Sequence, residues 1–341
     1  MTQELNIALD CMGGDDAPKI VIEGANLIAK YNNKIHFLLF GDDTLIKPLL
    51  KKAPYLEGQY TLIHTLESIS ADEKPSAALR KGLNSSMRLA INAVKDQKAH
   101  VAVSAGNTGA LMAISKIVLR PLPSIDRPAI VTSIPNQKKK GTVLLDMGAN
   151  VECDSDVLFQ FAVMGHAFAK IALKISDPQI GILNIGSEDL KGNDAVRSAA
   201  LMIKESDLQR SFYGYVEGDD ITKGTVDVVV TDGFTGNIVL KSIEGTVKLI
   251  SSTLKEGFSN SIIAKLGYLL SMKSIKKSSE MLDPRLHNGA MLVGLNGVVV
   301  KSHGGTDSLG FSNAIKVAIS LVEENINERI SNELTVTSEE I

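Results

Sequence analysis

Residues 5–41 read LNIALDCMGGDDAPKIVIEGANLIAKYNNKIHFLLFG and contain one complete strand-helix-strand unit. LNIALD (5–10) and IHFLLFG (35–41) are short apolar runs of the kind found in strands that are buried on both faces. Between them, Pro18 precedes a stretch of helical periodicity over 19–30. Strands that are joined through a helix pair in parallel, so this segment predicts a parallel sheet covered by helices.

The same alternation continues through most of the chain. Further strands are expected at 61–65, 100–106, 179–186, 212–218, 226–233 and 290–305. Further helices are expected after Asp42, at 76–95, from 107 onward, and at 154–173, 193–205, 234–254 and 308–329. The runs 129–134 and 141–148 are separated by the polar turn PNQKKK, which predicts a hairpin and therefore an antiparallel strand within the sheet.

No low-complexity linker or internal repeat interrupts this alternation, so residues 1–330 are expected to form a single α/β catalytic domain. The last residues, TVTSEEI, have no apolar period. A disordered tail is therefore expected over 331–341.

Composition and charge narrow the class of protein. The chain has 36 Lys and Arg against 39 Asp and Glu, a net charge of −3, which argues against a surface devoted to nucleic acid. Its two cysteines, Cys11 and Cys153, lie far apart and form no CxxC pair, which argues against a disulfide framework or a thiolate zinc site. They indicate a reducing compartment, so a cytoplasmic protein is expected.

Membrane insertion is not expected either. The N-terminus has no basic region followed by a long apolar stretch, as a secretion signal would have. No uncharged apolar run approaches the roughly 18 residues needed to cross a bilayer. Association with a membrane surface remains open.

Glycine is concentrated where predicted strands end. In open α/β sheets ligands bind beyond these ends, where free backbone N–H groups at helix starts hold anions. Six glycine-containing loops suggest a site for an anionic ligand: residues 12–16, 104–109, 146–150, 185–187, 232–237 and 303–307. For any single loop, a tight turn with a capping Asn, Asp or Thr is at least as good an explanation.

Familiar catalytic fingerprints are missing. The sequence has no GxGxxG, P-loop, GxSxG or HExxH pattern, which disfavours ordinary dinucleotide binding, ATP hydrolysis, serine hydrolase chemistry and zinc proteolysis. Backbone N–H groups and helix ends can still bind phosphate without any of these patterns.

Three polar side chains are candidates for chemistry. Lys191, within GSEDLKGND, is either a solvated surface lysine or a cation presented to a cleft by the residues that flank it. Asn237 is either a helix cap or a neutral donor to an oxyanion. His303 is a structural histidine, a base or an anion donor. Cys11 and Cys153 are expected to be buried fillers rather than nucleophiles.

The segment 257–279 is amphipathic and basic. Its large apolar residues fall at helical spacing, and all its charged residues are lysines. On an acidic protein this pattern predicts a docking surface for an anionic membrane or an acidic carrier protein. An ordinary packed helix pair or a dimer interface with solvated lysines is the alternative.

Eight motifs, in order, carry a resemblance to a known family: LDCMGGDDAP, KPSAALRKGLNSSM, SAGNTGALMA, DRPAI, LLDMGANVECD, NIGSEDLKGND, VTDGFTGNIVLK and GAMLVGLNGVVVKSHGGTD. From about residue 5 to about 328 the chain resembles the bacterial phosphate acyltransferases of phospholipid synthesis, the PlsX family.

The resemblance implies an activity and its partners. The expected enzyme moves a long-chain acyl group from acyl-acyl-carrier-protein to inorganic phosphate, without a cofactor or metal. It also implies a three-layer α/β/α fold like that of phosphotransacetylase and the isopropylmalate dehydrogenase group, and a homodimer. Peripheral contact with the inner face of the cell membrane is implied as well, with the acyl phosphate passing to the membrane-bound glycerol-3-phosphate acyltransferase.

Site residues follow from the loops and from the resemblance together. The resemblance makes Lys191 and Asn237 the candidate catalytic residues, expected to stabilise the oxyanion. The residues expected to bind substrate or phosphate are Gly13, Gly14, Asp15, Gly106, Asn107, Thr108, Asp146, Asn150, Asp232, Gly236, His303 and Gly304. A helical protrusion at about 255–285 is expected to dock the carrier or the membrane through Lys255, Lys265, Leu269, Leu270, Lys273, Lys276, Lys277 and Arg285.

Two other functions remain open. A short-chain phosphotransacetylase that uses acyl-coenzyme A would share the phosphate chemistry, but it would have no use for the amphipathic segment. A non-catalytic carrier-binding or membrane scaffold would use that segment alone, but it would have no use for six polar glycine loops.

Overall fold

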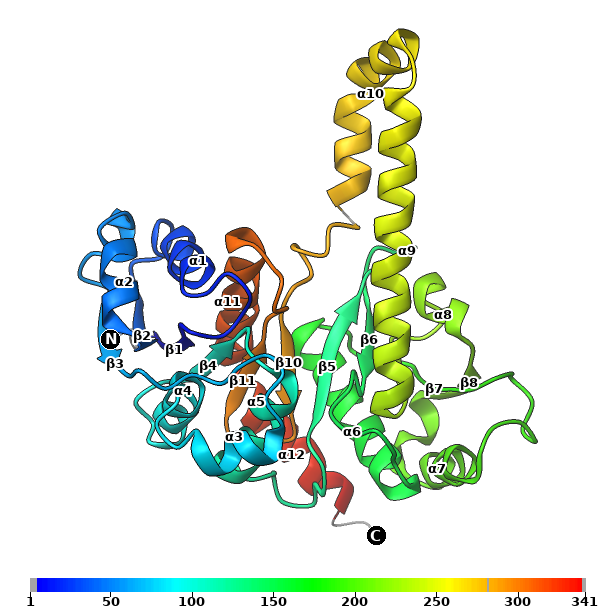
Figure 1. The fold of residues 1–341 in the computed structure, drawn as a ribbon. Helices are drawn as coiled ribbons and strands as arrows, with labels where there is room; N and C mark the ends of the chain where they lie inside the picture. The colour runs from blue at the N-terminus through cyan, green and yellow to red at the C-terminus, as the bar shows by residue number, and fades with distance from the viewer. Residues whose placement is uncertain (1–4, 281, 339–341) are drawn as a thin grey trace.

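The computed structural model describes residues 5–280 and 282–338, and its strands form one sheet (Figure 1). The strands lie in the order β3-β2-β1-β4-β11-β10-β5-β6-β9-β7-β8. Their bounds are β1 Leu5–Asp10, β2 Ile35–Gly41, β3 Tyr60–His64, β4 Val101–Ser104, β5 Ala129–Ile134, β6 Thr142–Leu145, β7 Ile180–Leu183, β8 Phe212–Val216, β9 Val228–Val230, β10 Ala290–Val293 and β11 Val298–Lys301.

Strand direction reverses in the middle of the sheet. The outer pairs are parallel, whereas the three central pairs, β11-β10, β10-β5 and β5-β6, are antiparallel. This confirms both the mostly parallel sheet and the predicted hairpin. Because three antiparallel pairings separate β11 from β6, strands β1, β4 and β11 point in one direction, and β6, β9 and β7 point in the opposite one.

Helices cover both faces of the sheet, which confirms the three-layer α/β/α class. Their bounds are α1 Lys19–Ala29, α2 Asp43–Leu50, α3 Pro75–Lys81, α4 Ser86–Lys95, α5 Thr108–Leu119, α6 Ser155–Ala172, α7 Asp194–Lys204, α8 Gly218–Lys223, α9 Gly233–Ser259, α10 Ile262–Glu280, α11 Ser308–Glu323 and α12 Ile326–Ser338, with 3-10 turns at Pro54–Leu56 and Asp207–Ser211. One apolar cluster joins the sheet to α1, α6, α7, α11 and α12. The other joins it to α4, α5 and the inner part of α9.

Two predicted elements are each split by a local signal. The helix expected at 76–95 is two helices, because α3 ends at Gly82 and the Ser85 side chain caps α4 by accepting a hydrogen bond from the backbone of Arg88. The strand expected at 290–305 is the antiparallel pair β10 and β11. Gly294 lies in the turn between them with φ +88°, a conformation that favours glycine.

The predicted C-terminal tail is wrong over residues 331–338. The helix expected at 308–329 ends at Glu323, Asn325 takes a left-handed conformation, and α12 then continues to Ser338. Ile330 and Leu334, four residues apart, are buried in the core and stabilise this helix. Residues 339–341 lie outside the described part of the chain.

Helices α9 and α10 leave the body of the molecule as an antiparallel pair, which we call the helical hairpin (Figure 1). It begins earlier than expected, because α9 is one continuous helix from Gly233 to Ser259 rather than a helix that ends at 254. At its tip the rings of Phe258 and Tyr268 lie 5.2 Å apart. None of the described helices is both long enough and apolar enough to span a membrane.

Candidate active site

Three of the predicted loops meet at one end of the sheet, beyond the adjacent strands β1, β4 and β11. The backbone N–H of Asp15 donates to the carbonyl of Gly304 at 3.0 Å, which links the first loop to the last. A Cβ added at Gly13 would lie 2.7 Å from the backbone nitrogen of Gly106, so glycine is required for these two loops to approach. We call this group the phosphate-loop cluster: residues 12–16, 104–109 and 301–307.

A buried carboxylate, Asp10, lies beneath this cluster. Its two oxygens accept hydrogen bonds from the hydroxyls of Ser86 and Ser104, both at 2.6 Å. Burial raises the pKa of Asp10, while these hydrogen bonds and the charge of Lys301 lower it. Asp10 therefore anchors the ends of β1 and β4 to α4.

His303 projects from the cluster toward α9. Its Nδ1 accepts a hydrogen bond from the backbone N–H of Gly305 at 3.1 Å, so in the neutral ring Nε2 carries the proton. Desolvation lowers the pKa of His303; Glu244 raises it, and Lys241 is among the cations that lower it further. The neutral ring is therefore a hydrogen-bond donor that faces the middle of α9.

A second group of predicted loops meets at the end of β6 and β9. Asp146 is fully buried, and its carboxylate accepts hydrogen bonds from backbone N–H groups of Ile130, Gly148, Ala149 and Asn150. The N–H of Gly233 donates to the carbonyl of Asn150 at 2.7 Å. These bonds fix the loop 146–150 against the start of α9.

Asn237 lies on the first turns of α9 beside this loop. A Cβ added at Gly236 would overlap the carbonyl oxygen of Asp146, so glycine is required where the helix crosses the loop. One added at Gly148 would lie 3.4 Å from the Cβ of Asn237. The Asn237 side chain is exposed and makes no hydrogen bond within the described part of the chain, so its amide is available to a ligand.

Lys191 lies in the loop after β7, the strand next to β9. Its Nζ forms an ion pair with Glu188 at 2.8 Å, and its side chain lies over Gly186. The hydrogen bond to Glu188 raises the pKa of Lys191, so the lysine is charged at neutral pH. The structure gives Lys191 no contact with Asn237.

The six predicted loops therefore form two groups rather than one. Strands β1, β4 and β11 run opposite to β6, β9 and β7, yet their ends lie at nearly the same height of the sheet: Leu144 of β6 pairs with Thr132, and Val131 is level, through Met291, with Val300 of β11.

Helix α9 begins beside the loop 146–150, where the N–H of Gly233 donates to the carbonyl of Asn150. Asn237, Lys241, Glu244 and Lys248 are spaced by four, three and four residues and share one side of this helix.

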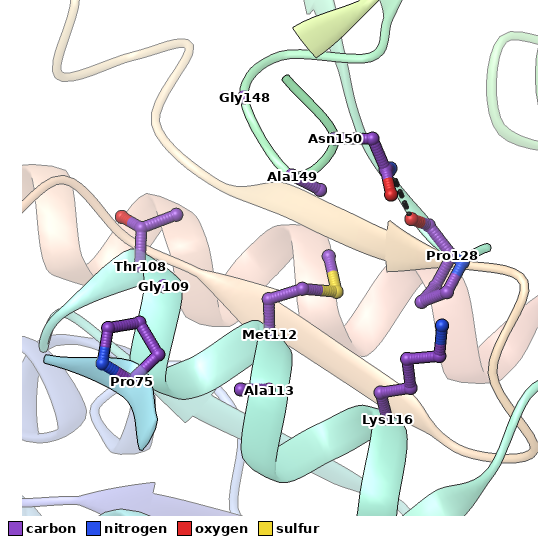
Figure 2. A pocket seen from close by; sticks show the side chains of 10 residues that line it. All are labelled: Pro75, Thr108, Gly109, Met112, Ala113, Lys116, Pro128, Gly148, Ala149 and Asn150. Atoms are coloured by element: carbon purple, nitrogen blue, oxygen red, sulfur yellow. Dashed lines mark hydrogen bonds between the residues drawn. The ribbon is translucent and has the colours of Figure 1, made fainter. Parts of the chain in front are cut away.

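A cavity of about 280 Å³ separates α5 from the loop 146–150 (Figure 2). Thr108, Gly109 and Met112 line it from α5, and Gly148 and Asn150 line it from the opposite side. Its size is near the lower limit for small-molecule sites. The cavity brings predicted residues of both groups, Thr108 and Asn150, to one space.

The side chains of two predicted site residues, Asn107 and Asp232, form hydrogen bonds with the protein's own backbone. Asn107 caps α5 through the N–H of Ala110 and donates to the carbonyl oxygens of Ala71 and Glu73. Asp232 caps α9 by accepting from the N–H of Thr235 at 2.7 Å. Their side chains position the loops, which leaves backbone groups, Asn237 and the cations for a ligand.

Neither cysteine is placed as a nucleophile. Cys11 is fully buried. Burial, with the charges of Asp146 and Asp232, raises the pKa of Cys153 to about 12, so the thiolate is scarce at neutral pH.

The predicted docking residues divide into two sets. Leu269 and Leu270 are 64% and 87% exposed on α10, and Lys255, Lys265, Lys273 and Lys276 are also exposed on the helical hairpin. The side chain of Lys277 lies outside the described residues.

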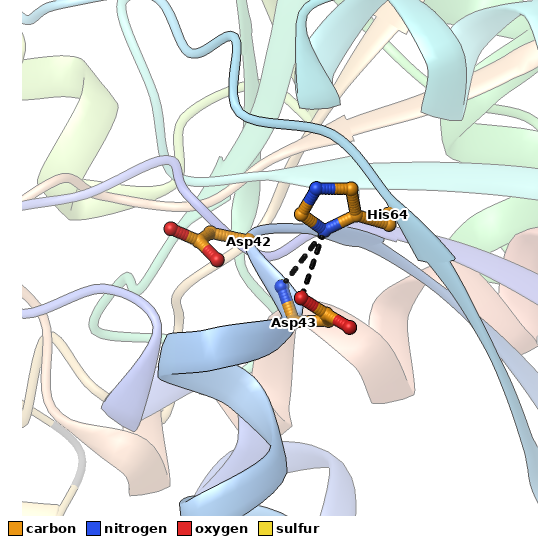
Figure 3. Close-up of side chains that lie close together, drawn as sticks. All are labelled: Asp42, Asp43 and His64. Carbon is orange, nitrogen blue, oxygen red and sulfur yellow. Dashed lines mark hydrogen bonds and ion pairs between the residues drawn. The ribbon is translucent and has the colours of Figure 1, made fainter.

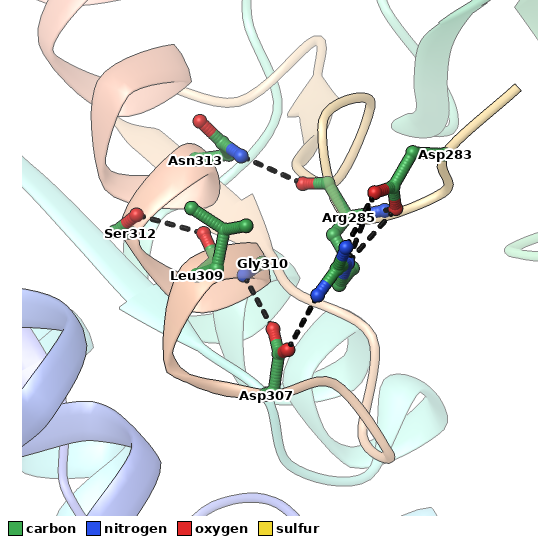
Figure 4. Close-up of polar contacts among 7 residues, drawn as sticks. All are labelled: Asp283, Arg285, Asp307, Leu309, Gly310, Ser312 and Asn313. Atoms are coloured by element: carbon green, nitrogen blue, oxygen red, sulfur yellow. Dashed lines mark hydrogen bonds and ion pairs between the residues drawn. The ribbon is translucent and has the colours of Figure 1, made fainter. Parts of the chain in front are cut away.

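Arg285 is exposed but already has ion-pair partners within the chain. It forms ion pairs with Asp283 at 2.7 Å and with Asp307, the cap of α11, at 3.1 Å (Figure 4). The Asn313 side chain also donates to its carbonyl oxygen. These contacts fasten the segment after the helical hairpin to the loop 303–307, and the docking role of Arg285 stays a prediction.

One group of side chains lies close enough together to hold a metal ion: Asp42, Asp43 and His64 (Figure 3). His64 Nδ1 lies 3.0 Å from Asp43, and Asp42 caps α2 through the N–H of Thr44. These contacts join the start of α2 to the end of β3 and so account for the proximity of the three side chains.

Sequence reasoning missed Asp10, Lys301 and Lys241. Asp10 and Lys301 are each the last residue of a buried strand, directly before a glycine loop, and a charged residue at that position was an available signal. Lys241 carried no such signal, because it lies within a long helix, away from any strand end.

Comparisons with known proteins agree with this architecture. A family model described as "Fatty acid synthesis protein" matches residues 5–329. The chain is 54% identical to the phosphate acyltransferase of Paramagnetospirillum magneticum and 52% identical to that of Rhodospirillum rubrum, over 98% of this chain and 95% of each relative.

Solved structures share the fold at low identity. A phosphotransacetylase from Streptococcus pyogenes superposes with a TM-score of 0.65 at 18% identity, over 95% of both chains. A branched-chain phosphotransacylase from Enterococcus faecalis gives 0.56 at 13% identity, over 93% of this chain and 99% of that one. By its sequence matches, the chain belongs to the fatty acid synthesis protein family, among enzymes of the phosphate acyltransferase class.

Proposed function

We propose that this protein transfers a long-chain acyl group from acyl-acyl-carrier-protein to inorganic phosphate and so supplies acyl phosphate for phospholipid synthesis. A phosphate oxygen forms a bond to the thioester carbonyl carbon, the carbon–sulfur bond breaks, and the carrier leaves as a thiol after taking up a proton. The names and near-complete coverage of the curated relatives support acyl transfer to phosphate.

In this reaction the protein does not need to supply the nucleophile or activate the leaving group. Phosphate is an anionic nucleophile at pH 7, and a thiolate is a good leaving group. What remains is to position the reactants and to stabilise the oxyanion that forms on the carbonyl. Backbone N–H groups of glycine loops and a few fixed donors are suited to that work.

The observation that carries the proposal is the placement of Asn237. Its amide is exposed and makes no hydrogen bond within the described residues, and its backbone is placed where Gly236 packs over Asp146 and where Gly148, without a side chain, leaves room for it. A donor that is fixed in advance stabilises a developing oxyanion without reorganising. Asn237 is therefore assigned to the thioester oxygen.

Lys191 is assigned a complementary role. It is charged, and its only ion pair in the described chain is the solvent-exposed one with Glu188, which water and salt screen. A substrate anion can therefore take the place of Glu188. Lys191 then neutralises the oxyanion or the departing thiolate.

The helical hairpin supplies the proposed docking surface. Its exposed leucines suit a lipid surface, and its lysines suit an acidic carrier or anionic headgroups. In this proposal the protein is a cytoplasmic homodimer, partly bound to the inner face of the membrane, where a glycerol-3-phosphate acyltransferase consumes the product.

A short-chain phosphotransacetylase is the second candidate, favoured by the fold shared with the Streptococcus pyogenes enzyme. Activity on acetyl-coenzyme A that exceeds activity on palmitoyl-carrier would support it. A scaffold without activity would bind carrier or vesicles but turn over neither donor.

The test is to incubate purified protein with palmitoyl-acyl-carrier-protein, with and without inorganic phosphate, and to follow carrier thiol and acyl phosphate together. Phosphate-dependent appearance of both in equal amounts is expected. Thiol without acyl phosphate would indicate hydrolysis, and no thiol would refute the proposed donor.

A further inference from the structure

The cavity of about 280 Å³ between α5 and the loop 146–150 has a wall built from one face of a helix (Figure 2). Gly109, Met112, Ala113 and Lys116 all line it, and residues with this spacing share one face of α5. Figure 2 shows the Met112 side chain pointing from this face toward the loop. Because a methionine side chain is flexible, this wall can adjust to an apolar ligand.

The other residues around the cavity also present mostly apolar surface. Pro75, Pro128 and Ala149 line it together with the backbone of Gly148. A Cβ added at Gly109 would lie 2.9 Å from the Cγ of Pro75, so the missing side chain lets the proline ring pack against α5. The cavity is therefore bounded by carbon atoms on several sides.

The charged and amide side chains of the wall already have protein partners. The Asn150 amide donates to the carbonyl of Pro128 at 2.9 Å and to the carboxylate of Asp146 at 3.0 Å. Lys116 is exposed to solvent, and its ammonium donates to the carbonyl of Asp126 at 3.3 Å. What the cavity offers a ligand is therefore mainly apolar surface.

This cavity lies next to the residue assigned to the thioester oxygen. A Cβ added at Gly148, which lines the cavity, would lie 3.4 Å from the Cβ of Asn237. Gly148 has φ +123°, a conformation that favours glycine, so no side chain stands between the cavity and Asn237 at this point. With the thioester carbonyl at Asn237, the carbon chain attached to it can extend past Gly148 into the cavity.

The volume of the cavity limits how much of a chain can enter. An apolar cavity of about 150 Å³ holds one benzene molecule, so a cavity of about 280 Å³ holds roughly ten carbon atoms. A longer acyl chain would fill it with the carbons nearest the thioester and leave its end outside. Each methylene group buried there would tighten binding about fourfold.

We propose that this cavity binds the part of the acyl chain next to the thioester, and that Ala113 and Ala149 determine how long a chain it accepts. This assignment rests on the proposed function and adds the residues that set the specificity for its acyl donor. Both alanines are half-buried, one on α5 and the other on the facing loop, and a larger side chain at either position would occupy part of the cavity.

The experiment measures the binding of straight-chain alkyl phosphates, from butyl to dodecyl phosphate, by isothermal titration calorimetry without carrier protein. These compounds resemble acyl phosphate but lack its carbonyl group, so neither transfer nor hydrolysis interferes. For the parent protein, affinity is expected to rise about fourfold per methylene group up to roughly decyl phosphate and then to level off.

Two variants fill the cavity from opposite sides. Ala113→Leu adds about three carbon atoms to the wall, so decyl phosphate should bind about 50-fold more weakly while butyl phosphate binds normally. Ala149→Leu should have the same effect, which keeps the proposal testable if one variant does not fold. Ala172→Leu is the matched control, because Ala172 is the half-buried last residue of α6 and does not line the cavity.

Turnover of carrier donors gives a second readout. For both cavity variants, kcat/KM for decanoyl-carrier relative to butyryl-carrier should fall by a similar factor, with KM for phosphate unchanged. An equal loss with both donors would mean that the cavity holds the thiol-bearing arm of the carrier. A raised KM for phosphate alone would mean that it holds phosphate. Either result would overturn the assignment.

Failure of the assignment and failure of the proposed function give different results. If both cavity variants bind every alkyl phosphate as the parent does, the assignment is wrong even though the parent makes acyl phosphate. If the variants change the alkyl phosphate series as expected but the parent makes no acyl phosphate from any carrier donor, the proposed function fails and the binding site stands.

Discussion

Asp146→Asn is the substitution that most directly tests how the loop 146–150 holds Asn237. The two carboxylate oxygens of Asp146 accept only from N–H groups. Oδ1 accepts from Ile130 at 2.9 Å and from Gly148 at 3.2 Å, and Oδ2 accepts from the backbone and side chain of Asn150 at 2.7 and 3.0 Å. The Ala149 N–H is shared between both oxygens at 3.1 Å.

Asparagine has nearly the same shape but places an NH₂ group on one side. In either orientation at least two N–H groups then face a donor instead of an acceptor, in a fully buried position. Hydrogen bonds to a charged group are worth about 1.5 to 3 kcal/mol each, so the free energy of unfolding should fall by about 3 to 6 kcal/mol. The contact between Gly148 and Asn237 should be lost with the loop, and turnover with it.

Urea unfolding at neutral pH, followed by circular dichroism, measures the first effect, and phosphate-dependent release of carrier thiol measures the second. Asp42→Asn is the matched control, because Asp42 is a surface helix cap and asparagine caps equally well. Its expected change is below about 0.5 kcal/mol. If Asp146→Asn lowers stability by less than about 1 kcal/mol and leaves turnover normal, the reasoning about this loop is refuted.

Four further outcomes are expected. Lys191→Ala should lower kcat by about 10² to 10³ with an unchanged urea midpoint, since an oxyanion donor is worth up to about 4 kcal/mol; near-normal turnover would remove it from the mechanism. Replacing both Leu269 and Leu270 by Glu should release the protein from phosphatidylglycerol vesicles in flotation assays, whereas unchanged flotation would leave α10 as a dimer interface. Cys153→Ser should keep normal activity, and an inactive variant would revive a covalent route. Alkylation of Cys153 by iodoacetamide should accelerate about tenfold per pH unit between pH 8 and 10, because its pKa is about 12, and a plateau near pH 9 would contradict the burial argument.

The helical hairpin illustrates a mixed outcome. The periodicity of the sequence predicted that the hairpin is apolar and basic. Its predicted start, near 255, was too late, because the sequence of the outer half of α9 resembles that of an ordinary helix. In the structure α9 has exposed residues from its first turns, at Phe234, Asn237 and Ile238, and is exposed at every position from 248 to 257, which begins before that boundary. Arg285, grouped with the docking lysines by its charge, forms ion pairs with Asp283 and Asp307, which composition alone could not predict.

The sequence by itself determined most of the strands and helices, the hairpin in the middle of the sheet, and the glycine loops at strand ends. These features depend on local periodicity, on turn residues and on the chain's few glycines and prolines, all of which can be read within ten or twenty residues. Its eight ordered motifs also predicted the family that the comparisons then showed.

Only the tertiary structure decided how the loops are grouped. Three antiparallel pairings in the centre of the sheet, with the register of their strands, bring the ends of β1, β4 and β11 in one half of the sheet to nearly the height of the ends of β6 and β9 in the other half. Strand order and direction depend on contacts between residues more than a hundred positions apart, which no local pattern encodes. For the same reason Thr108 and Asn150, forty-two residues apart in sequence, line one cavity only because the fold brings α5 and the loop 146–150 together.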